Sequence, residues 1–533
     1  MIIGQLHQAI RQAFIQATGS QPPSFVIEPA KRAFFGDFST NIAMVAANES
    51  EENPVAVAQK IVNKMTASEV FKSVSVATPG FINFTVTDEY LLEVVRAIIR
   101  SPEAYGRSDL GKEIRVLLEF VSANPTGPLT LANGRGAFVG EAIARVLELY
   151  GCTVMREYYS NDRGNQIISL GKTVHGEPGG EYAGKYIEAL KKRVKEKTAE
   201  AAGEQAAVII MEEMIKPVLK QVGIDFHQFF SEKSLFATGV YKKTLELLKT
   251  RGLVYEADGA TWLTTTRFGD DKDRVLVRTD GSETYFAADI AYHAYKIQRG
   301  YHRLINVMGA DHFTYSKQMT MVVEGVLRDF YMWGGKLDWV VTQIVRLIED
   351  GKEVKMSKRA GTYVPLDELL EEVGPDVTRF FFLSRSVDAQ MDFDLNLAKS
   401  ATSQNPVFYI QYAYARISSI FRQFSKTDDF AVPERIMITH PVERRLLLRI
   451  IQFPDLVEEI AGDLQVHKLA HYAHALATDL HAFYEQLRVQ GEKPEIAQSR
   501  LAILKATSLT IKKTLDLMGV SAPSRMIRDS KES

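Results

Sequence analysis

Two loops in the 533-residue chain carry residue types that suit phosphate chemistry. Residues 125–136 read PTGPLTLANGRG and lead from an apolar run into a helical pattern. Unpaired backbone N–H groups at a helix N-terminus, together with the helix dipole, favour an anion such as phosphate. Residues 351–364 read GKEVKMSKRAGTYV and hold Lys355 and Lys358. Two ammonium groups on one loop can neutralise the charge of a phosphate ligand, although an exposed basic loop is the plainer alternative.

Two acidic residues could bind a cationic side chain. Glu119 lies near the end of the apolar run 114–122, with Ser122 and Asn124 just after it, and Tyr285 precedes Asp289 by four residues. The structural alternatives are pairing of Glu119 with a structural arginine and a helix N-terminal position for Asp289.

These side chains need a parallel sheet to position them. The apolar run at 114–122 predicts a buried parallel strand, and residues 135–150 predict a helix that ends at Gly151. Further strand patterns lie at 153–162, 274–280, 303–311 and 337–348. The order of strand, loop and helix predicts the start of a doubly wound α/β domain.

The remaining patterns divide the chain into three predicted domains. Residues 1–108 mix helical and strand patterns and end in a polar linker, which predicts an α+β domain. Residues 109–400 form the α/β domain, with a mostly helical, charged insertion near 168–262. Residues 401–533 are helical throughout and predict an all-α domain. The predicted fold class is therefore multidomain α/β.

Composition excludes several other classes of protein. Hydrophobic residues make up 46% and charged residues 24%, with a net charge of −2, as in an ordinary globular protein. No apolar run approaches the ~20 residues of a membrane helix, and the N-terminus lacks a signal-peptide pattern. The single cysteine, Cys152, excludes an internal disulfide framework and a cysteine-based zinc site. We therefore expect a cytoplasmic protein with no membrane partner.

Longer motifs identify a family. Lys355-Met356-Ser357-Lys358 is the KMSK signature of class I aminoacyl-tRNA synthetases. The segments LEFVSANPTGPL, REYYSNDRGNQI, TYFAADIAYHAYK, MGADHF and NPVFYIQYAYARI resemble arginyl-tRNA synthetases of the bacterial type. GDFSTNIAM and PGFINF near the N-terminus and LMGVSAP near the C-terminus extend the resemblance over essentially the whole chain.

The resemblance implies an architecture and a reaction. The first domain contacts the tRNA elbow, the centre is a Rossmann-type catalytic domain and the helical domain binds the anticodon. L-Arginine attacks the α-phosphorus of ATP to give arginyl-adenylate, and the 3′ end of tRNA(Arg) then takes the arginyl group. The implied partners are therefore tRNA(Arg), L-arginine and ATP. Mg²⁺ is brought by ATP, no protein-bound metal is implied, and the protein is expected to be a monomer. In this family, arginine activation requires bound tRNA.

The resemblance also assigns roles to residues where the motifs match. The residues implied in catalysis are Lys355, Lys358, Thr130 and Asn133, and those that bind arginine are Glu119, Ser122, Asn124, Tyr285 and Asp289. The residues implied in ATP binding are Ala132, Gly134, Arg135, Gly309, Asp311, His312, Met356 and Ser357. Those implied in tRNA binding are Phe81, Asn83, Tyr412 and Met526. A structural role remains the alternative for His312, as do core packing for Phe81 and a turn for Asn83.

One segment departs from the family pattern. Relatives usually read His-Val-Gly-His where this chain has Thr130, Leu131, Ala132 and Asn133. Threonine and asparagine can donate hydrogen bonds to phosphate but cannot be cationic, and loss of one transition-state hydrogen bond costs ~2–4 kcal/mol. The methyl group of Ala132 can also crowd adenine. We expect an active enzyme in which Lys355, Lys358 and Arg135 carry more of the phosphate charge.

Three alternatives stay open at this point. The altered signature alone favours a catalytically impaired paralogue that only binds tRNA. A synthetase for another amino acid conflicts with the acidic pair at positions 119 and 289. Four histidines on one helical face, at positions 467, 471, 474 and 481, suggest either a metal site or a polar seam or RNA-facing stripe. The spacing lacks a complete metal motif, so we favour the seam or stripe.

Overall fold

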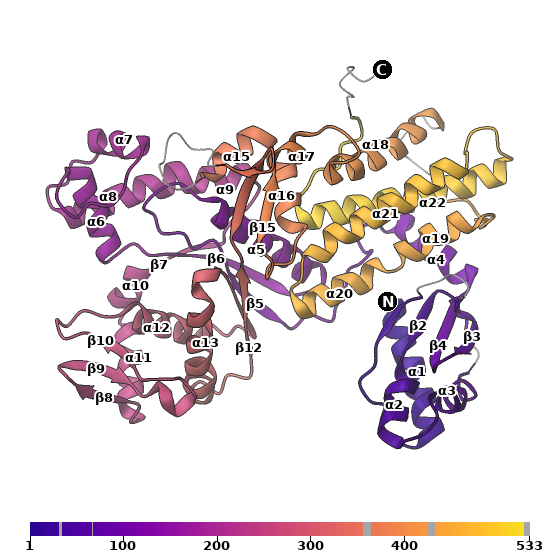
Figure 1. Cartoon of the computed structure of the whole chain (residues 1–533), viewed down its shortest axis with the longest axis horizontal. Coiled ribbons are helices and arrows are strands. Elements are labelled where there is room, and N and C mark those ends of the chain that lie inside the picture. The colour runs from indigo at the N-terminus through magenta and orange to yellow at the C-terminus, as the bar shows by residue number, and fades with distance from the viewer. Residues whose placement is uncertain (31–34, 67, 355–363, 425–431, 527–533) are drawn as a thin grey trace.

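The computed structural model of the chain describes residues 1–30, 35–66, 68–354, 364–424 and 432–526 (Figure 1). Four signature residues lie outside the described residues: Lys355 and Lys358, predicted to act in catalysis, and Met356 and Ser357, predicted to bind ATP. Within the described ranges, no helix has both the length and the apolar character needed to cross a membrane.

The N-terminal part is an α+β unit. Its antiparallel sheet has the order β1 (Ile27–Pro29), β2 (Phe38–Thr40), β4 (Phe81–Val86) and β3 (Phe71–Ala77). Four helices accompany the sheet: α1 (Ile2–Thr18), α2 (Ile42–Ser50), α3 (Pro54–Val62) and α4 (Asp88–Arg100). The side chain of Asn53 caps α3, and Pro54 occupies its first turn, so this helix begins where local chemistry favours it.

The central sheet has five parallel strands, in the order β12 (Lys336–Thr342), β11 (Arg303–Gly309), β5 (Arg115–Glu119), β6 (Thr153–Ser160) and β7 (Gln228–Ser231). Val116, Leu117 and Leu118 are fully buried in β5, as the apolar run predicted. The chain runs outward from β5 to one edge and then returns through β11 to the other edge. The loops at this reversal form the crevice in which doubly wound sheets bind ligands.

Helix α5 (Leu131–Leu149) crosses from β5 to β6. It begins four residues before the predicted start because Thr130 caps it. The close packing of α5 on the sheet requires small residues, because a Cβ atom at Gly140 would lie 2.4 Å from the ring of Phe120. The N-terminus of α5 is thereby held at the carboxyl ends of β5 and β11.

The predicted helical insertion at 168–262 is only partly helical. It contains α7 (Lys185–Arg193), α8 (Ala199–Ile210) and α9 (Lys216–Gln221), and α6 (Asn165–His175) begins just before it. However, β7 joins the main sheet as an edge strand, and it is followed by α10 (Glu232–Ala237) and α11 (Val240–Thr250). Strands β8 (Val254–Ala257) and β9 (Ala260–Leu263) pair with β10 (Arg274–Val277) in a separate antiparallel sheet.

The run predicted as one strand at 337–348 is two strands in two sheets. After β12, strand β13 (Val345–Glu349) pairs with β14 (Lys352–Glu353) and β15 (Met391–Asp394). The helices of this half of the domain are α12 (Tyr285–Gln298), α13 (Phe313–Val322), α14 (Arg328–Phe330), α15 (Leu366–Val373), α16 (Pro375–Leu383) and α17 (Leu395–Lys399).

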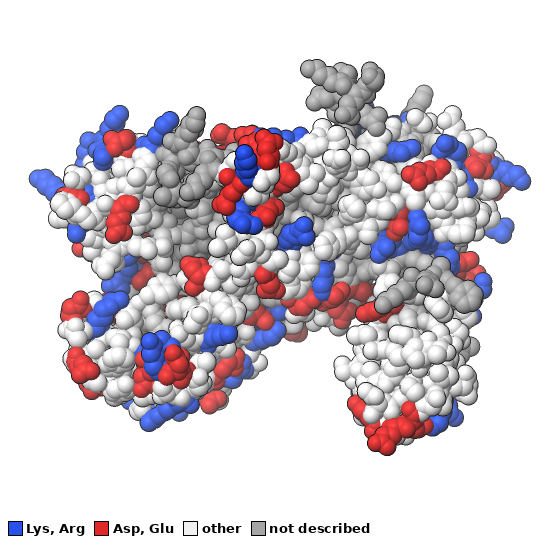
Figure 2. Space-filling view, in the orientation of Figure 1, with Lys and Arg blue, Asp and Glu red and all other residues white. Residues whose placement is uncertain are grey.

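The C-terminal part is all-α, as predicted. It consists of α18 (Pro406–Phe424), α19 (Pro441–Ile450), α20 (Phe453–Asp463), α21 (His467–Gln486) and α22 (Pro494–Met518). Arg444 on α19 reaches the N-terminal unit, where it pairs with Asp37 at 2.7 Å and with Asp88. Figure 1 shows the N-terminal unit beside α19 and α20, away from the central sheet. Figure 2 shows Lys and Arg side chains over the C-terminal helices, with Asp and Glu side chains among them.

Candidate active site

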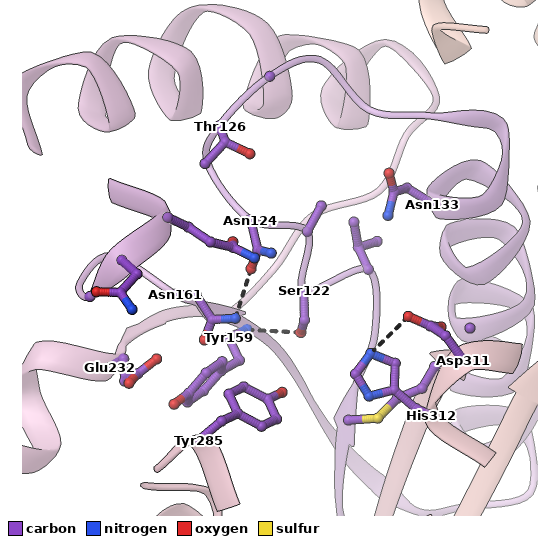
Figure 3. A pocket seen from close by; sticks show the side chains of 18 of the residues that line it. Ser122, Asn124, Thr126, Asn133, Tyr159, Asn161, Glu232, Tyr285, Asp311 and His312 are labelled. Carbon is purple, nitrogen blue, oxygen red and sulfur yellow. Dashed lines mark hydrogen bonds and ion pairs between the residues drawn. The ribbon is translucent and has the colours of Figure 1, made fainter. Parts of the chain in front are cut away.

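A cavity of 1440 Å³ opens at the carboxyl ends of β5, β6 and β11 (Figure 3). The loops after these strands line it, together with the first turns of α5, α10 and α12. Pockets for a single small ligand are typically about 300–1,000 Å³. This cavity therefore has room for two small substrates side by side.

A strained turn ends β5 at the cavity. Val121 has a φ of 68° and Ser122 a φ of 39°, both in the left-handed region. The N–H of Ser122 donates to the carbonyl of Phe120 at 2.9 Å, which closes a γ-turn around a β-branched residue. The Ser122 hydroxyl donates to Glu119 Oε1 at 3.0 Å and accepts from the N–H of Tyr159 at 3.1 Å. Ser122 thus joins the ends of β5 and β6.

The next residues of this loop place an amide at the cavity. Asn161 Nδ2 donates to Asn124 Oδ1 at 2.7 Å, and both residues line the cavity. The Tyr158 hydroxyl on β6 donates to the carbonyl of Ala123 at 2.6 Å and so holds the loop after β5 in place. Because Asn161 fixes the oxygen of Asn124, the amide nitrogen of Asn124 is the group left for a ligand.

Glu119 lines the cavity but already has a cationic partner. Its Oε2 lies 2.5 Å from Nζ of Lys296, and the Lys296 side chain is fully buried. Glu119 therefore has a structural ion pair, with a lysine in place of the arginine that we expected, and its contact with arginine stays a prediction. The negative charge of Glu119 is largely matched before any substrate arrives.

Tyr285 and Asp289 lie one turn apart on α12, as their spacing predicts. Tyr285 lines the cavity and is 42% exposed. Asp289 lies just behind the cavity surface, 6% exposed, and accepts from the Tyr315 hydroxyl at 2.6 Å. Burial opposes the ionisation of Asp289, but hydrogen bonds from His293 and Tyr315 and the charge of Lys296 favour its ionised form. Asp289 therefore presents a stable negative charge.

Glu232 is a carboxylate that sequence reasoning missed. It is the first residue of α10, lines the cavity and is 8% exposed (Figure 3). Burial raises the pKa of Glu232 to about 7, although Arg163 and Tyr159 lower it. The one available signal was an acidic residue directly after the short run QFFS, inside the segment assigned to a helical insertion.

The altered signature forms a capping box at the start of α5. Asn133 Oδ1 accepts from the N–H of Thr130 at 2.9 Å and from its hydroxyl at 2.8 Å. The Thr130 oxygen accepts from the N–H of Asn133 at 3.3 Å. The hydroxyl hydrogen of Thr130 is therefore occupied, which corrects the expectation that both side chains donate to phosphate.

The capping box leaves the amide nitrogen of Asn133 for the cavity. Among the described residues, none accepts a hydrogen bond from it, and in Figure 3 it points to the side where Asp311 and His312 lie. Thr130, Ala132 and Asn133 all line the cavity, and Ala132 is exposed there. Its methyl group takes up part of the cavity at the position where the family pattern predicts glycine.

Arg135 and Gly134, both predicted to bind ATP, belong to the packing of α5. Arg135 is fully buried and donates to the carbonyls of Gln343, Ala389 and Ser386 at 2.7, 2.9 and 2.8 Å. Burial lowers the pKa of Arg135 to about 10. Neither residue lines the cavity, and a Cβ atom at Gly134 would lie 2.7 Å from Leu366. The Arg135 guanidinium therefore does not compensate for the missing histidines, which corrects our expectation.

Gly309 is the last residue of β11, Asp311 and His312 lie in the short helical turn after it, and all three line the cavity opposite the start of α5. His312 Nε2 lies 3.5 Å from Asp311 Oδ2, and the Asp311 side chain is 80% exposed. These residues are placed as expected for a nucleotide support, and their contact with ATP stays a prediction.

The residues predicted to bind tRNA lie on other elements, away from the cavity. Phe81 in β4 is 37% exposed, whereas Asn83 is only 4% exposed, so little of its amide can be reached. The ring of Tyr412 on α18 stacks between Phe408 at 6.3 Å and His481 at 6.2 Å. Met526 is half-buried at the end of the last described segment.

The histidine stripe of α21 packs against neighbouring groups. His471 Nε2 lies 3.2 Å from the carbonyl of Ser384, and His474 and His481 pack on Tyr409 at 5.2 and 4.4 Å. Within the described part of the chain, no three His, Cys, Asp or Glu side chains form a group that could hold a metal ion. These contacts favour a polar helix seam, while His471 and His474 are exposed and a contact of the stripe with RNA stays a prediction.

Comparison with known proteins gives matches along nearly the whole chain. The arginyl tRNA synthetase N terminal domain family matches residues 4–86, the class I (R) tRNA synthetase catalytic domain family matches residues 219–379, and the DALR anticodon binding domain family matches residues 410–526. These ranges fall inside the three predicted domains, whose boundaries stay predictions.

Individual relatives agree with the family matches. The chain is 41% identical to an arginine–tRNA ligase of Desulforudis audaxviator over 96% of this chain and 95% of that protein. It is 40% identical to the arginine–tRNA ligase of Heliobacterium modesticaldum over 95% of this chain and 94% of that protein. The fold matches Thermus thermophilus arginyl-tRNA synthetase with a TM-score of 0.80 at 22% identity, over 99% of this chain and 100% of that one. The chain therefore belongs to the arginyl-tRNA synthetase family.

Proposed function

We propose that this chain is an arginine–tRNA ligase. It activates L-arginine with ATP to form arginyl-adenylate and pyrophosphate, and it transfers the arginyl group to the 3′ end of tRNA(Arg). The observation that carries this proposal is one cavity with carboxylates at one end and a helix N-terminus at the other. The first end suits the guanidinium of arginine and the second suits the triphosphate of ATP. The carboxylate of the substrate arginine and the α-phosphorus of ATP can therefore meet between the two ends.

The acidic end selects the side chain of arginine. Glu232 and Asp289 supply the negative charge. Lys296 lies within ion-pair distance of Glu119, whereas no described lysine or arginine lies as close to Glu232 or Asp289. Tyr285 provides a partly exposed ring beside them, and Ser122 and Asn124 provide polar groups on the loop after β5. Buried carboxylates around a planar cation reject neutral side chains, because their charge would then be desolvated without a partner.

The other end binds ATP. Asn133 Nδ2 donates to a phosphate oxygen, Ala132 and Gly309 lie against the nucleotide, and His312 with Asp311 supports it from β11. Lys355 and Lys358, with Met356 and Ser357 between them, approach the triphosphate from the 351–364 loop and neutralise the leaving pyrophosphate. Mg²⁺ enters as part of the nucleotide substrate. No protein side chain forms a covalent intermediate in this scheme.

The tRNA is bound by the two outer domains. Phe81 stacks on a base of the tRNA elbow, with Asn83 as its polar neighbour, and Tyr412 and Met526 contact the anticodon loop. We also propose that the protein acts as a monomer in the cytoplasm, as expected for this family.

Charging of tRNA(Arg) with labelled amino acids tests the proposed function. We expect arginine to be attached, and we expect lysine and citrulline to be rejected, since lysine lacks the planar fork and citrulline lacks the charge. Citrulline is the sharper comparison because it differs from arginine by one atom at the end of the side chain. Retention of tRNA on a filter without charging would instead make the chain a tRNA-binding paralogue.

A further inference from the structure

Behind the acidic end of the cavity, six side chains form one continuous polar chain. They come from β5, β11, α12 and α13 and connect Glu119 with Asp289, the two acidic residues predicted to bind arginine. In order, they are Glu119, Lys296, Asn306, His293, Asp289 and Tyr315. Of these, Lys296, Asn306 and His293 are fully buried.

Lys296 fixes the direction of the hydrogen bonds made by the side chains of Asn306 and His293. An ammonium group can only donate, so the Asn306 atom that lies 2.8 Å from Nζ of Lys296 must be the oxygen. The amide nitrogen of Asn306 then faces Nε2 of His293 at 3.1 Å and donates to it. Because Nε2 accepts, the proton of a neutral imidazole is on Nδ1.

That proton faces Asp289. His293 Nδ1 lies 2.9 Å from the backbone carbonyl of Asp289 and 3.2 Å from its Oδ1. A second proton on His293 would place two donors against each other at Asn306, in a site with no exposed surface. The other groups that face His293 are the rings of Tyr292 on α12 and Trp339 on β12, and neither removes this conflict.

We propose that Lys296, Asn306 and His293 are positioning residues that set the charge and orientation of the arginine site. Lys296 cancels the charge of Glu119, and the fixed direction of the chain keeps His293 neutral. Asp289 is therefore oriented by a hydrogen bond but keeps its full negative charge for the substrate. This inference rests on the proposed function, because it assigns Asp289 to the guanidinium of arginine.

Asn306→Asp is the direct test of this arrangement. The introduced carboxylate would accept from Lys296 and from a protonated Nε2, so His293 would become an imidazolium. The net charge of the cluster would stay the same, but the imidazolium Nδ1 would lie 3.2 Å from Asp289 Oδ1, whereas the new carboxylate would lie on the far side of the ring, so the negative charge that Asp289 presents to the substrate would weaken. We expect KM for arginine to rise by about tenfold or more, as for loss of a charge partner in a buried site. KM for ATP and for tRNA is expected to stay unchanged. Gln298→Glu adds the same charge at an exposed position of α12 and serves as the matched control.

Nitrogen NMR of histidine-labelled protein reads the ring directly, with His293→Gln to assign the signal. We expect a neutral ring protonated on Nδ1 rather than on Nε2 in the unmodified protein at pH 8, and this measurement does not depend on whether a variant folds. An imidazolium there would overturn the inference, and so would an imidazolium in the Asn306→Asp protein with unchanged KM for arginine. Equal changes in all three KM values would also overturn it. If the unmodified chain never activates arginine, the proposed function fails instead, and the spectrum still reports whether His293 is held neutral.

Discussion

Asn133→Asp is expected to lower the rate of arginine-dependent ATP–pyrophosphate exchange by about 10²–10³-fold, the usual effect of removing one transition-state hydrogen-bond donor. The carboxylate keeps an oxygen where Asn133 Oδ1 now accepts from the Thr130 N–H and hydroxyl, so the capping box survives. What changes is the group that faces the cavity, where an amide donor becomes an anion. The rate should therefore fall while KM for arginine stays close to its original value.

The control for this prediction separates helix capping from catalysis. Thr130→Ser keeps the hydroxyl and should leave exchange nearly unchanged, and the melting temperature of Asn133→Asp should equal that of the unmodified protein. Normal exchange by Asn133→Asp would show that the amide nitrogen does not reach phosphate. The lysines at 355 and 358 would then carry the leaving charge without help from α5.

Glu232→Gln is expected to lower kcat/KM for arginine by about 100-fold at pH 8, as when one partner of a buried charge pair is removed. The unmodified enzyme should also lose kcat/KM as pH falls through about 7, because the pKa of Glu232 is raised to about 7 and only its ionised form attracts a guanidinium. The groups that face this carboxyl are Tyr159, Arg163, Asp162 and Asp289. In the variant, this pH dependence should disappear.

Stability distinguishes a binding role of Glu232 from a structural one. A carboxyl whose pKa is raised by folding binds protons more tightly in the folded state, so its ionisation destabilises the fold as pH rises from about 4.5 through 7. Glu232→Gln should therefore melt at the same or a higher temperature at pH 8. A lower melting temperature together with lost activity would assign Glu232 to the fold rather than to substrate binding.

Long buried patterns made most of the fold predictable. The runs at 114–122, 153–162 and 303–311 became β5, β6 and β11, because buried parallel strands read as continuous apolar segments. Strand β7 was missed because its four residues are too few to show the alternation of apolar and polar residues that is typical of a strand. The run at 337–348 divides at residues 343–344, where the Gln343 carbonyl accepts from Arg135 and Ile344 is 60% exposed, and a local pattern cannot show this contact.

The candidate site was predictable where motifs are local and unpredictable where partners are distant. Glu119, Ser122 and Asn124 line the cavity because they share one loop at the end of one strand. Lys296 lies 177 residues from Glu119 in the sequence, so neither their ion pair nor the resulting loss of free charge could be read from spacing. Arg135 was wrongly expected at ATP for the same reason, since the carbonyls that bind it come from residues 343–389.

Arginine-dependent ATP–pyrophosphate exchange, run with and without tRNA(Arg), tests most directly whether a cavity with the Thr-Leu-Ala-Asn segment is a working synthetase site. We expect exchange only when arginine and tRNA are both present, and none with tRNA and citrulline. Such a result would make the capping box at Thr130 and Asn133 a functional version of the family signature. Absence of exchange with tRNA demonstrably bound would contradict the account and identify residues 130–133 as the cause of an inactive site.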